Sequence, residues 1–321
     1  MQSGILRCFS MSIIVFMVLF AAPARAQIYP DKPIRLIVGS GPDVIPRIFA
    51  QRLGEVWGPP VVVDPRPGVG GALAAEIVAR AQPDGYTLLW VTAAHAMLAS
   101  FAIGKFDLAA DFAPVIMATV CPYVLAVNPS VNARSVQELI ALARAQPGKL
   151  NYASVGNGSP GHLAVELLKS HTGINVVHVP YKTVAGAMTD IAGGHIDFII
   201  QVAAAVRGLA EAGKVRALAV TTPQRSRIFP DLPSMIEAGY PNFEMVGWNG
   251  ILAPANTPRP LTAKLNAEVN RALLLPEIGQ RVNGSACEPA PANTGESFAV
   301  VIRRDVEKWK ALIKSAGLKV D

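Results

Sequence analysis

Short apolar runs alternate along the chain with longer stretches whose apolar residues recur at helical spacing. The apolar runs that are typical of buried strands occupy residues 34–38, 61–63, 87–91, 150–154, 176–179, 198–201 and 215–220. The stretches with helical spacing occupy residues 43–57, 72–81, 135–146, 161–170, 184–192, 203–212, 261–274 and 296–316. Because strands and helices alternate, the pattern predicts βαβ units and mostly parallel sheets, which define an α/β protein.

The N-terminal pattern differs from the rest. Arg7 precedes an apolar run over residues 9–22, and small residues stand at both ends of Ala24-Arg25-Ala26. This layout is typical of a secretory signal peptide, which predicts removal of residues 1–26 and export to the periplasm. An uncleaved N-terminal anchor is the alternative. No later stretch has the length and apolarity of a membrane-spanning helix.

The remaining length suits two domains of about 100–200 residues each. The chain carries 29 Lys and Arg and 23 Asp and Glu. These charges are spread along the chain without a basic run or interleaved aromatic residues, which argues against a nucleic-acid groove. A mildly basic chain is compatible with a small anionic ligand.

The cysteines and histidines limit which metal-binding or catalytic functions the chain can have. Cys8 lies inside the predicted signal peptide, so Cys121 and Cys287 remain. In an exported protein they are compatible with one disulfide or with two buried thiols, and the sequence does not decide between these. Neither the cysteines nor the histidines have the spacing of metal ligands, and the chain has no Gly-x-Ser-x-Gly nucleophile motif. We therefore expect no metal, no cofactor and no enzymatic activity.

Open α/β sheets bind ligands where strands end and loops lead into helices. The loops in question cover residues 39–41, 66–71, 92–95, 154–162 and 180–183 and the end of the strand at 198–201. From them we take as candidate ligand-binding residues Ser40, Gly70, Gly71, Thr92, Ser154, Asn157, Gly158, Ser159, Tyr181 and Gln201.

The loop over residues 154–162 is the most informative of these. Its glycines let the backbone approach a ligand closely, and the free N–H groups of the following helix favour an anion. The side chains of Ser154, Asn157 and Ser159 are additional hydrogen-bonding groups, although capping of the helix is an equally good explanation for them. Residues 156–161 also match the dinucleotide pattern G-x-G-x-x-G. No acidic residue follows the next strand, so this match is weak.

Several sequence segments occur here in the same order as in a known family. They extend over essentially the whole chain after residue 26. They are residues 29–35, 64–71, 83–89, 147–154, 158–163, 178–182 and 213–221. Together they resemble the Bug family of periplasmic proteins, the solute receptors of tripartite tricarboxylate transporters.

The resemblance implies a two-lobed periplasmic binding protein of type II, with two mixed, mainly parallel sheets flanked by helices and a hinge of two segments. It places the crossings near residues 125–127 and 246–248. Lobe 1 is then residues 27–125 and 248–321, and lobe 2 is residues 126–247. The implied partners are a small carboxylate and the permease subunits of a transporter, with a monomeric receptor and no nucleic acid.

The resemblance also assigns roles to the candidate residues. In relatives a ligand carboxylate is held at the helix start after the fourth loop and by the tyrosine-containing fifth loop, which correspond here to residues 154–159 and Tyr181. The first loop, the Gly70–Gly71 loop and Thr92 are contributed by the opposite lobe.

Three departures from the family pattern affect the ligand. The first loop, residues 39–43, is shorter than usual, and Thr183 replaces a frequent glycine. Gln201 stands where many relatives have an aspartate, which removes a negative charge and disfavours a ligand with an amino group.

Two functions are alternatives to a transport receptor. One is a receptor of the same fold that feeds a sensor kinase, and the other is an α/β enzyme that uses the glycine-rich loop for a cofactor or acyl substrate.

Overall fold

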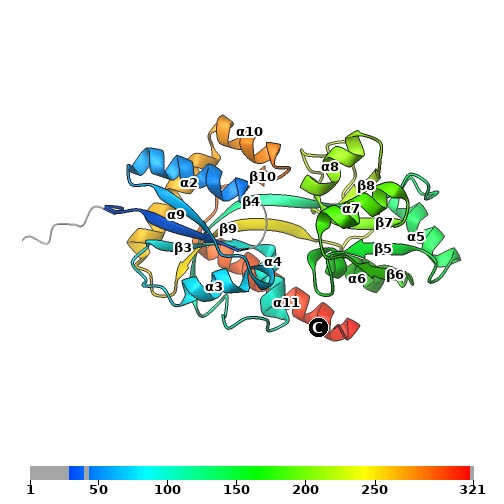
Figure 1. Cartoon of the computed structure of the whole chain (residues 1–321), viewed down its shortest axis with the longest axis horizontal. Coiled ribbons are helices and arrows are strands. Elements are labelled where there is room, and N and C mark those ends of the chain that lie inside the picture. The colour runs from blue at the N-terminus through cyan, green and yellow to red at the C-terminus, as the bar shows by residue number, and fades with distance from the viewer. Residues whose placement is uncertain (1–28, 40–42, 319–321) are drawn as a thin grey trace, which may run out of the picture. The chain divides into compact units, whose positions relative to one another are not determined.

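The computed structural model describes residues 29–39 and 43–318. Residues 32–321 form one compact unit, and residues 29–31 belong to a separate N-terminal unit. The predicted signal peptide and the candidate residue Ser40 lie outside the described residues. Figure 1 shows the ribbon with the elements labelled.

One group of strands forms sheet A. Strands β1 (Ile34–Val38), β2 (Val61–Pro65) and β3 (Thr87–Thr92) are parallel to one another, with β1 between the other two. Strand β9 (Val246–Pro254) lies antiparallel between β3 and the long strand β4 (Phe112–Val127). The short strand β10 (Glu288–Pro289) pairs with β4.

A second group forms sheet B. Strands β5 (Asn151–Ser154), β6 (Val177–Pro180) and β7 (Phe198–Val202) are parallel, with β5 in the middle. The last residues of β4 pair antiparallel with β7 and with β8 (Arg216–Val220). Sheet B is therefore joined to sheet A through β4.

Strand β4 determines how the two sheets face each other. Its pairing with β9 extends to Pro122, and its pairing with β7 begins at Tyr123. Because β4 runs in the same direction as β3 and opposite to β7, the carboxyl ends of both parallel groups point toward the middle of β4. Figure 1 shows β4 and β9 extending between the helices of the two groups.

Helices flank both sheets. Those around sheet A are α2 (Val44–Trp57), α3 (Ala72–Ala79), α4 (Ala93–Ser100), α9 (Arg259–Leu273), α10 (Pro276–Gly284) and α11 (Gly295–Ala316), with the 3₁₀ turn η1 (Val69–Gly71). Those around sheet B are α5 (Val136–Ala145), α6 (Pro160–Thr172), α7 (Val184–Gly193) and α8 (Ala203–Glu211). The expected mixed α/β architecture is confirmed, and the described strands form one continuous ten-stranded sheet in which β4 joins the two parallel groups.

The apolar face of each element is buried against its sheet, which is the main stabilising contribution to such a fold. Tyr152 and Phe198 are fully buried on one face of sheet B. Trp248 is 2% exposed at the start of β9, where its indole Nε1 donates to Asp305 Oδ2 at 2.7 Å. This contact satisfies the indole N–H, which a buried tryptophan requires.

A disulfide joins Cys121 to Cys287 and so answers the question that the sequence left open. It connects the middle of β4 to the segment between α10 and β10, across 166 positions of the chain. The bond fixes this segment against the strand that both sheets share.

We expect the double substitution Cys121→Ser/Cys287→Ser to lower the free energy of unfolding by about 2–5 kcal/mol, because removing a cross-link frees the unfolded chain. Urea denaturation of the oxidised protein, with and without reductant, measures this. Reductant should shift the wild-type midpoint and leave the variant unchanged. Equal midpoints for the oxidised wild type and the variant would contradict the expected stabilisation.

Candidate functional site

A cavity of about 550 Å³ lies where the carboxyl ends of the two parallel groups meet. From sheet A it is lined by the ends of β1 and β3 and by the first turns of α2 and α4, residues 38–39, 43–46, 90 and 92–95. From the other side it is lined by Cys121 and Tyr123 of β4, Val202 and Ala204 at the start of α8, and residues 247–249 and 284–287. A hollow of about 590 Å³ beside α8 and residues 228–232 shares no lining residue with this cavity.

Three helices begin at the cavity wall, namely α2, α4 and α8. Neither Asp43 at the start of α2 nor Val202 at the start of α8 caps its helix with a side chain. The Asp43 carboxylate instead accepts from Arg47 Nε at 3.0 Å, and this partner lowers the pKa of Asp43. Among the described residues, the N-cap side chains of α2 and α8 therefore leave the first-turn N–H groups uncapped. In α2 these are the N–H groups of Val44 and Ile45, because Pro46 has none. Such groups favour anions.

The start of α4 is capped by its own residues. Thr92 N donates to His95 Nδ1 at 3.1 Å, and the Thr92 hydroxyl lies 3.2 Å from the same nitrogen. His95 is 2% exposed, and burial lowers the pKa of its ring to about 4, so the ring is neutral with its proton on Nε2. Candidate Thr92 therefore lines the cavity with a hydroxyl that is already paired.

Close packing explains the glycines at this edge of sheet A. A Cβ atom on Gly71 would lie 2.7 Å from His95 Nε2, and one on Gly39 would lie 2.6 Å from the Gly71 Cα atom. A Cβ on Gly70 would meet the Leu98 side chain at 3.1 Å. Gly70 and Gly71 both have positive φ values, which glycine adopts without steric cost. Neither is among the residues that line the cavity.

The corresponding edge of sheet B carries most of the other candidates. Tyr181 N donates to Ser154 O at 2.8 Å, so the ends of β5 and β6 are in direct contact. Ser159 is the N-cap residue of α6, and its side chain does not cap the helix. In the described part of the chain, Ser159 Oγ is a buried atom without a hydrogen-bond partner. An unpaired buried hydroxyl at a helix start is a suitable group for binding an anion.

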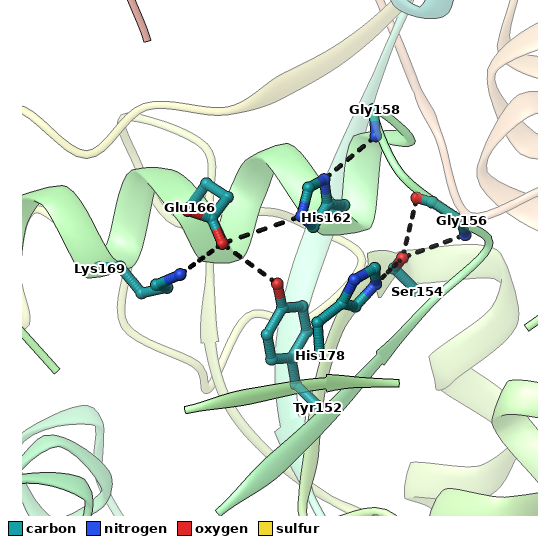
Figure 2. Close-up of polar contacts among 8 residues, drawn as sticks. All are labelled: Tyr152, Ser154, Gly156, Gly158, His162, Glu166, Lys169 and His178. Atoms are coloured by element: carbon teal, nitrogen blue, oxygen red, sulfur yellow. Dashed lines mark hydrogen bonds and ion pairs between the residues drawn. The ribbon is translucent and has the colours of Figure 1, made fainter. Parts of the chain in front are cut away.

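The Ser154 hydroxyl is used inside the loop itself (Figure 2). Ser154 is fully buried, and its Oγ lies 3.0 Å from Gly156 O and 3.1 Å from Gly156 N. His178 Nε2 lies 2.6 Å from the same oxygen. Ser154 thus shapes the backbone of residues 154–156, and Asn157 is exposed at the tip of the loop.

Two stacked histidines, His162 and His178, lie against this loop (Figure 2). The rings of His162 and His178 are 4.4 Å apart, and His162 Nδ1 accepts from Gly158 N at 3.1 Å. Burial lowers the pKa of both rings, that of His178 to about 4 with a further contribution from His162. Glu166 partly opposes the shift of His162.

The charge of Glu166 is balanced within the same cluster (Figure 2). Its Oε1 accepts from Lys169 Nζ at 2.7 Å and from the Tyr152 hydroxyl at 3.3 Å. His162 Nε2 lies 3.8 Å from this oxygen. The cluster is therefore a buried polar network that holds the loop, and it is separate from the lining of the cavity.

Tyr181 and Gln201 have partners within the protein. The Tyr181 hydroxyl donates to Asp190 Oδ2 at 2.6 Å, and burial together with this carboxylate raises the pKa of Tyr181 to about 12. Gln201 is 5% exposed, and its side-chain oxygen accepts from Val202 N at 2.9 Å. Both residues lie at the carboxyl edge of sheet B, outside the cavity lining.

The structure thus brings the described candidates to two facing edges and, among these, places only Thr92 in the cavity lining. The sequence analysis missed several wall residues, including Trp90, Tyr123, Val202 and Ala204. Val202 and Ala204 follow directly after Gln201, so the strand-to-helix junction could have indicated them. Residues 284–287 are far away in the sequence, and long-range contacts, including the disulfide to Cys121 and the pairing of β10 with β4, bring them to the wall.

Within residues 29–39 and 43–318, no group of histidine, cysteine and acidic side chains could hold a metal ion. The helices of these same stretches are all too short or too polar to cross a bilayer.

A cavity at facing strand ends between two connected sheets is the place where open α/β folds bind small ligands. Residues 45–318 match the family described as the tripartite tricarboxylate transporter family receptor, and the chain belongs to this family. The members of the family are solute-binding receptors of periplasmic transport systems.

Similar proteins cover nearly the whole chain. BugT of Bordetella pertussis is 32% identical over 307 residues, which span 94% of this chain and 94% of BugT. The structure of R. palustris Rpa4515 with adipate has a TM-score of 0.80 and 32% identity, and covers 91% of this chain and 100% of that one. MatC from Rhodopseudomonas palustris with bound malate has a TM-score of 0.74 and 26% identity, and covers 89% and 100%.

The lowered pKa of His178 predicts that the folded protein loses stability as the pH falls. Because the folded state lowers this pKa from 6.5 to about 4, the unfolded state takes up the proton first as the pH falls. The contribution to stability is complete above pH 6.5 and is lost between 6.5 and 4. His178→Gln keeps a donor for Ser154 but does not titrate, so its melting temperature should fall less steeply over this range.

Thermal unfolding of the wild type and of His178→Gln at a series of pH values measures how steeply each melting temperature falls as the pH falls. His171→Gln, at an exposed position of α6, is the matched control and should follow the wild type. Identical slopes for wild type and His178→Gln would show that the His178 ring does not cause acid lability.

Proposed function

We propose that this protein is a periplasmic receptor that captures a small carboxylate in the cavity between the two sheets and delivers it to a tripartite tricarboxylate transporter. The observation that carries this proposal is the convergence of uncapped helix starts on a 550 Å³ cavity in a chain of this receptor family. The adipate of Rpa4515 and the malate of MatC support a carboxylate, because both ligands are dicarboxylates.

Amide groups rather than salt bridges would hold the carboxylate. The described cavity lining contains no lysine or arginine, and its one acidic side chain, Asp43, is paired with Arg47. The N–H groups at the starts of α2 and α8 are therefore the donors for the negative charge. The start of α6 with the unpaired Ser159 hydroxyl is a further donor at the edge of sheet B. Gly161 of this helix packs against Ile200 of β7, two positions before the wall residue Val202.

Closure of the two halves would follow ligand binding. We assign residues 27–125 and 248–321 to lobe 1 and residues 126–247 to lobe 2, with β4 and the approach to β9 as the hinge. A ligand that contacts both halves favours the closed arrangement, and the transporter's membrane subunits would recognise that arrangement. No bond is made or broken in this process, so the receptor needs no catalytic residue or cofactor, and it acts as a monomer. Residues 1–26 would direct export and be removed.

Direct contacts already connect the proposed lobes on one side of the cavity. Arg207 of α8 donates to Asn283 O at 3.1 Å and to Gly284 O at 2.8 Å, at the carboxyl end of α10. A cation is favourable at that end of a helix. Glu288 Oε1 accepts from the Ser226 hydroxyl at 2.6 Å and from Arg227 N at 3.1 Å. These contacts would stabilise the closed receptor.

A thermal-shift screen with carboxylates tests the function. Adipate should raise the melting temperature with concentration, because a ligand that binds only the folded state stabilises it by mass action. Ala204→Trp fills the cavity from an exposed position and should abolish the rise, as should Ser159→Phe at the start of α6. Ser170→Phe, at an exposed position near the other end of α6, should keep it.

The outcomes separate the two anion positions. A rise that persists in Ser159→Phe removes Ser159 from the site, and one that persists in Ala204→Trp removes the cavity. If no carboxylate of any class changes the melting temperature, the proposed function is wrong.

Arg207→Ala should weaken carboxylate binding by about 3- to 30-fold, because it removes charge-assisted hydrogen bonds from the closed state. Isothermal titration calorimetry measures the Kd. Arg80→Ala, at an exposed arginine of the α3 end, is the control and should bind as the wild type does. Unchanged affinity in Arg207→Ala would mean that the contact with α10 does not contribute to closure.

A further inference from the structure

The wall of the cavity is mainly hydrocarbon. Apolar side chains come from every element that borders it, including Ile45 of α2, Trp90 of β3, Val202 before α8 and Ala286 before the disulfide. Trp90 is 5% exposed and is packed against Phe49, with the ring centres 5.8 Å apart. A solute in this cavity would therefore bury most of its body against carbon atoms, which is favourable only if that body is apolar.

Side-chain donors of the wall are directed into the protein. Asn249 Nδ2 donates to Thr119 Oγ1 at 2.8 Å and to Cys121 Sγ at 3.2 Å. The Ser285 hydroxyl donates to Arg281 O at 3.4 Å, and the Thr92 hydroxyl lies 3.2 Å from His95 Nδ1. For the described wall, this leaves as donors the Tyr123 hydroxyl, the Trp90 indole N–H and the helix-start amides, while His95 Nε2 is buried without a partner. The carboxylate itself requires donors of this kind.

An amino substituent on the ligand would also find no unpaired carboxylate in the described wall. Asp43, the acidic side chain of the described wall, is bonded to Arg47. At the end of β7 the neutral amide of Gln201 is bonded to Val202 N. A buried ammonium group without a paired carboxylate is strongly unfavourable.

We propose that the solute is a carboxylate with a hydrocarbon body, aliphatic or aromatic, that carries no hydroxyl or amino substituent. This rests on the proposed function and adds the class of carboxylate. A hydroxyl group on the body would leave water and, in the described wall, would have to compete with the carboxylate for the few donors that are not already paired. The cavity therefore discriminates against hydroxy acids through the cost of desolvating the extra hydroxyl.

Matched pairs of ligands test the proposal by isothermal titration calorimetry on the full mature protein. The pairs are 3-phenylpropanoate with 3-phenyllactate, and adipate with galactarate, which differ within each pair only in hydroxyl groups. We expect each hydroxylated member to bind at least about tenfold more weakly than its partner.

A variant of the wall supplies the converse test. Ile45→Thr places a hydroxyl on the α2 side of the cavity, with the loss of one side-chain carbon position, and should reduce the discrimination in at least one pair. Val56→Thr, at an exposed position near the other end of the same helix, should leave it unchanged. Circular dichroism melting confirms that both variants are folded.

The results distinguish this proposal from the function on which it rests. If hydroxylated acids bind as tightly as their partners, the preference for a hydrocarbon body is wrong and the carboxylate receptor stands. If none of the four acids and no other carboxylate binds, both are wrong. If the affinity ratio within each ligand pair is the same in wild type and Ile45→Thr, the hydrocarbon body of the ligand does not lie against this wall.

Discussion

The direction of β4 is the constraint on which the site depends. One continuous strand pairs with β9 in sheet A and then with β7 in sheet B, and it runs parallel in direction to β3 but opposite to β7. The carboxyl ends of both parallel groups therefore meet at the middle of β4. Since helices begin where those strands end, α2, α4 and α8 all start at the same cavity, and a cleft lined by helix starts follows from the topology alone.

The proposed recognition by backbone amides would account for the composition of the described site. A described lining without lysine or arginine avoids the cost of burying a cation when the cavity is empty, and the helix N–H groups are held in place by the helices themselves. The small residues at the sheet edges serve the same arrangement. Gly39 and Gly71 allow the first two loops of sheet A to pack against His95, and the stacked histidines 162 and 178 hold the loop over residues 154–159.

The segment over residues 283–288 connects features that the chain order keeps apart. The disulfide and β10 attach it to β4, and Arg207, Ser226 and Arg227 contact it from the elements around sheet B. It also forms part of the cavity wall. In the proposed closure, a covalently anchored segment at this place would restrict how the two halves move about β4.

The sequence by itself determined the strand and helix alternation, the start of α5 at Ser135 and the glycine-rich loop before α6, because periodicity, caps and turns are local properties of the chain. It also predicted which strand ends carry the candidate residues. It did not identify the long strand β4, because Pro114 and Pro122 interrupt its apolar run, and it treated the first turn of α4 as a loop. Only the tertiary structure decided the disulfide, the pairing of the Ser154, Tyr181 and Gln201 side chains inside the protein, and the cavity wall of Tyr123, Val202 and residues 284–287. The disulfide and the cavity wall depend on contacts between residues far apart in the chain, and local sequence patterns do not encode such distances. The Tyr181–Asp190 and Gln201–Val202 contacts are local, but they depend on side-chain conformations that the sequence pattern does not specify.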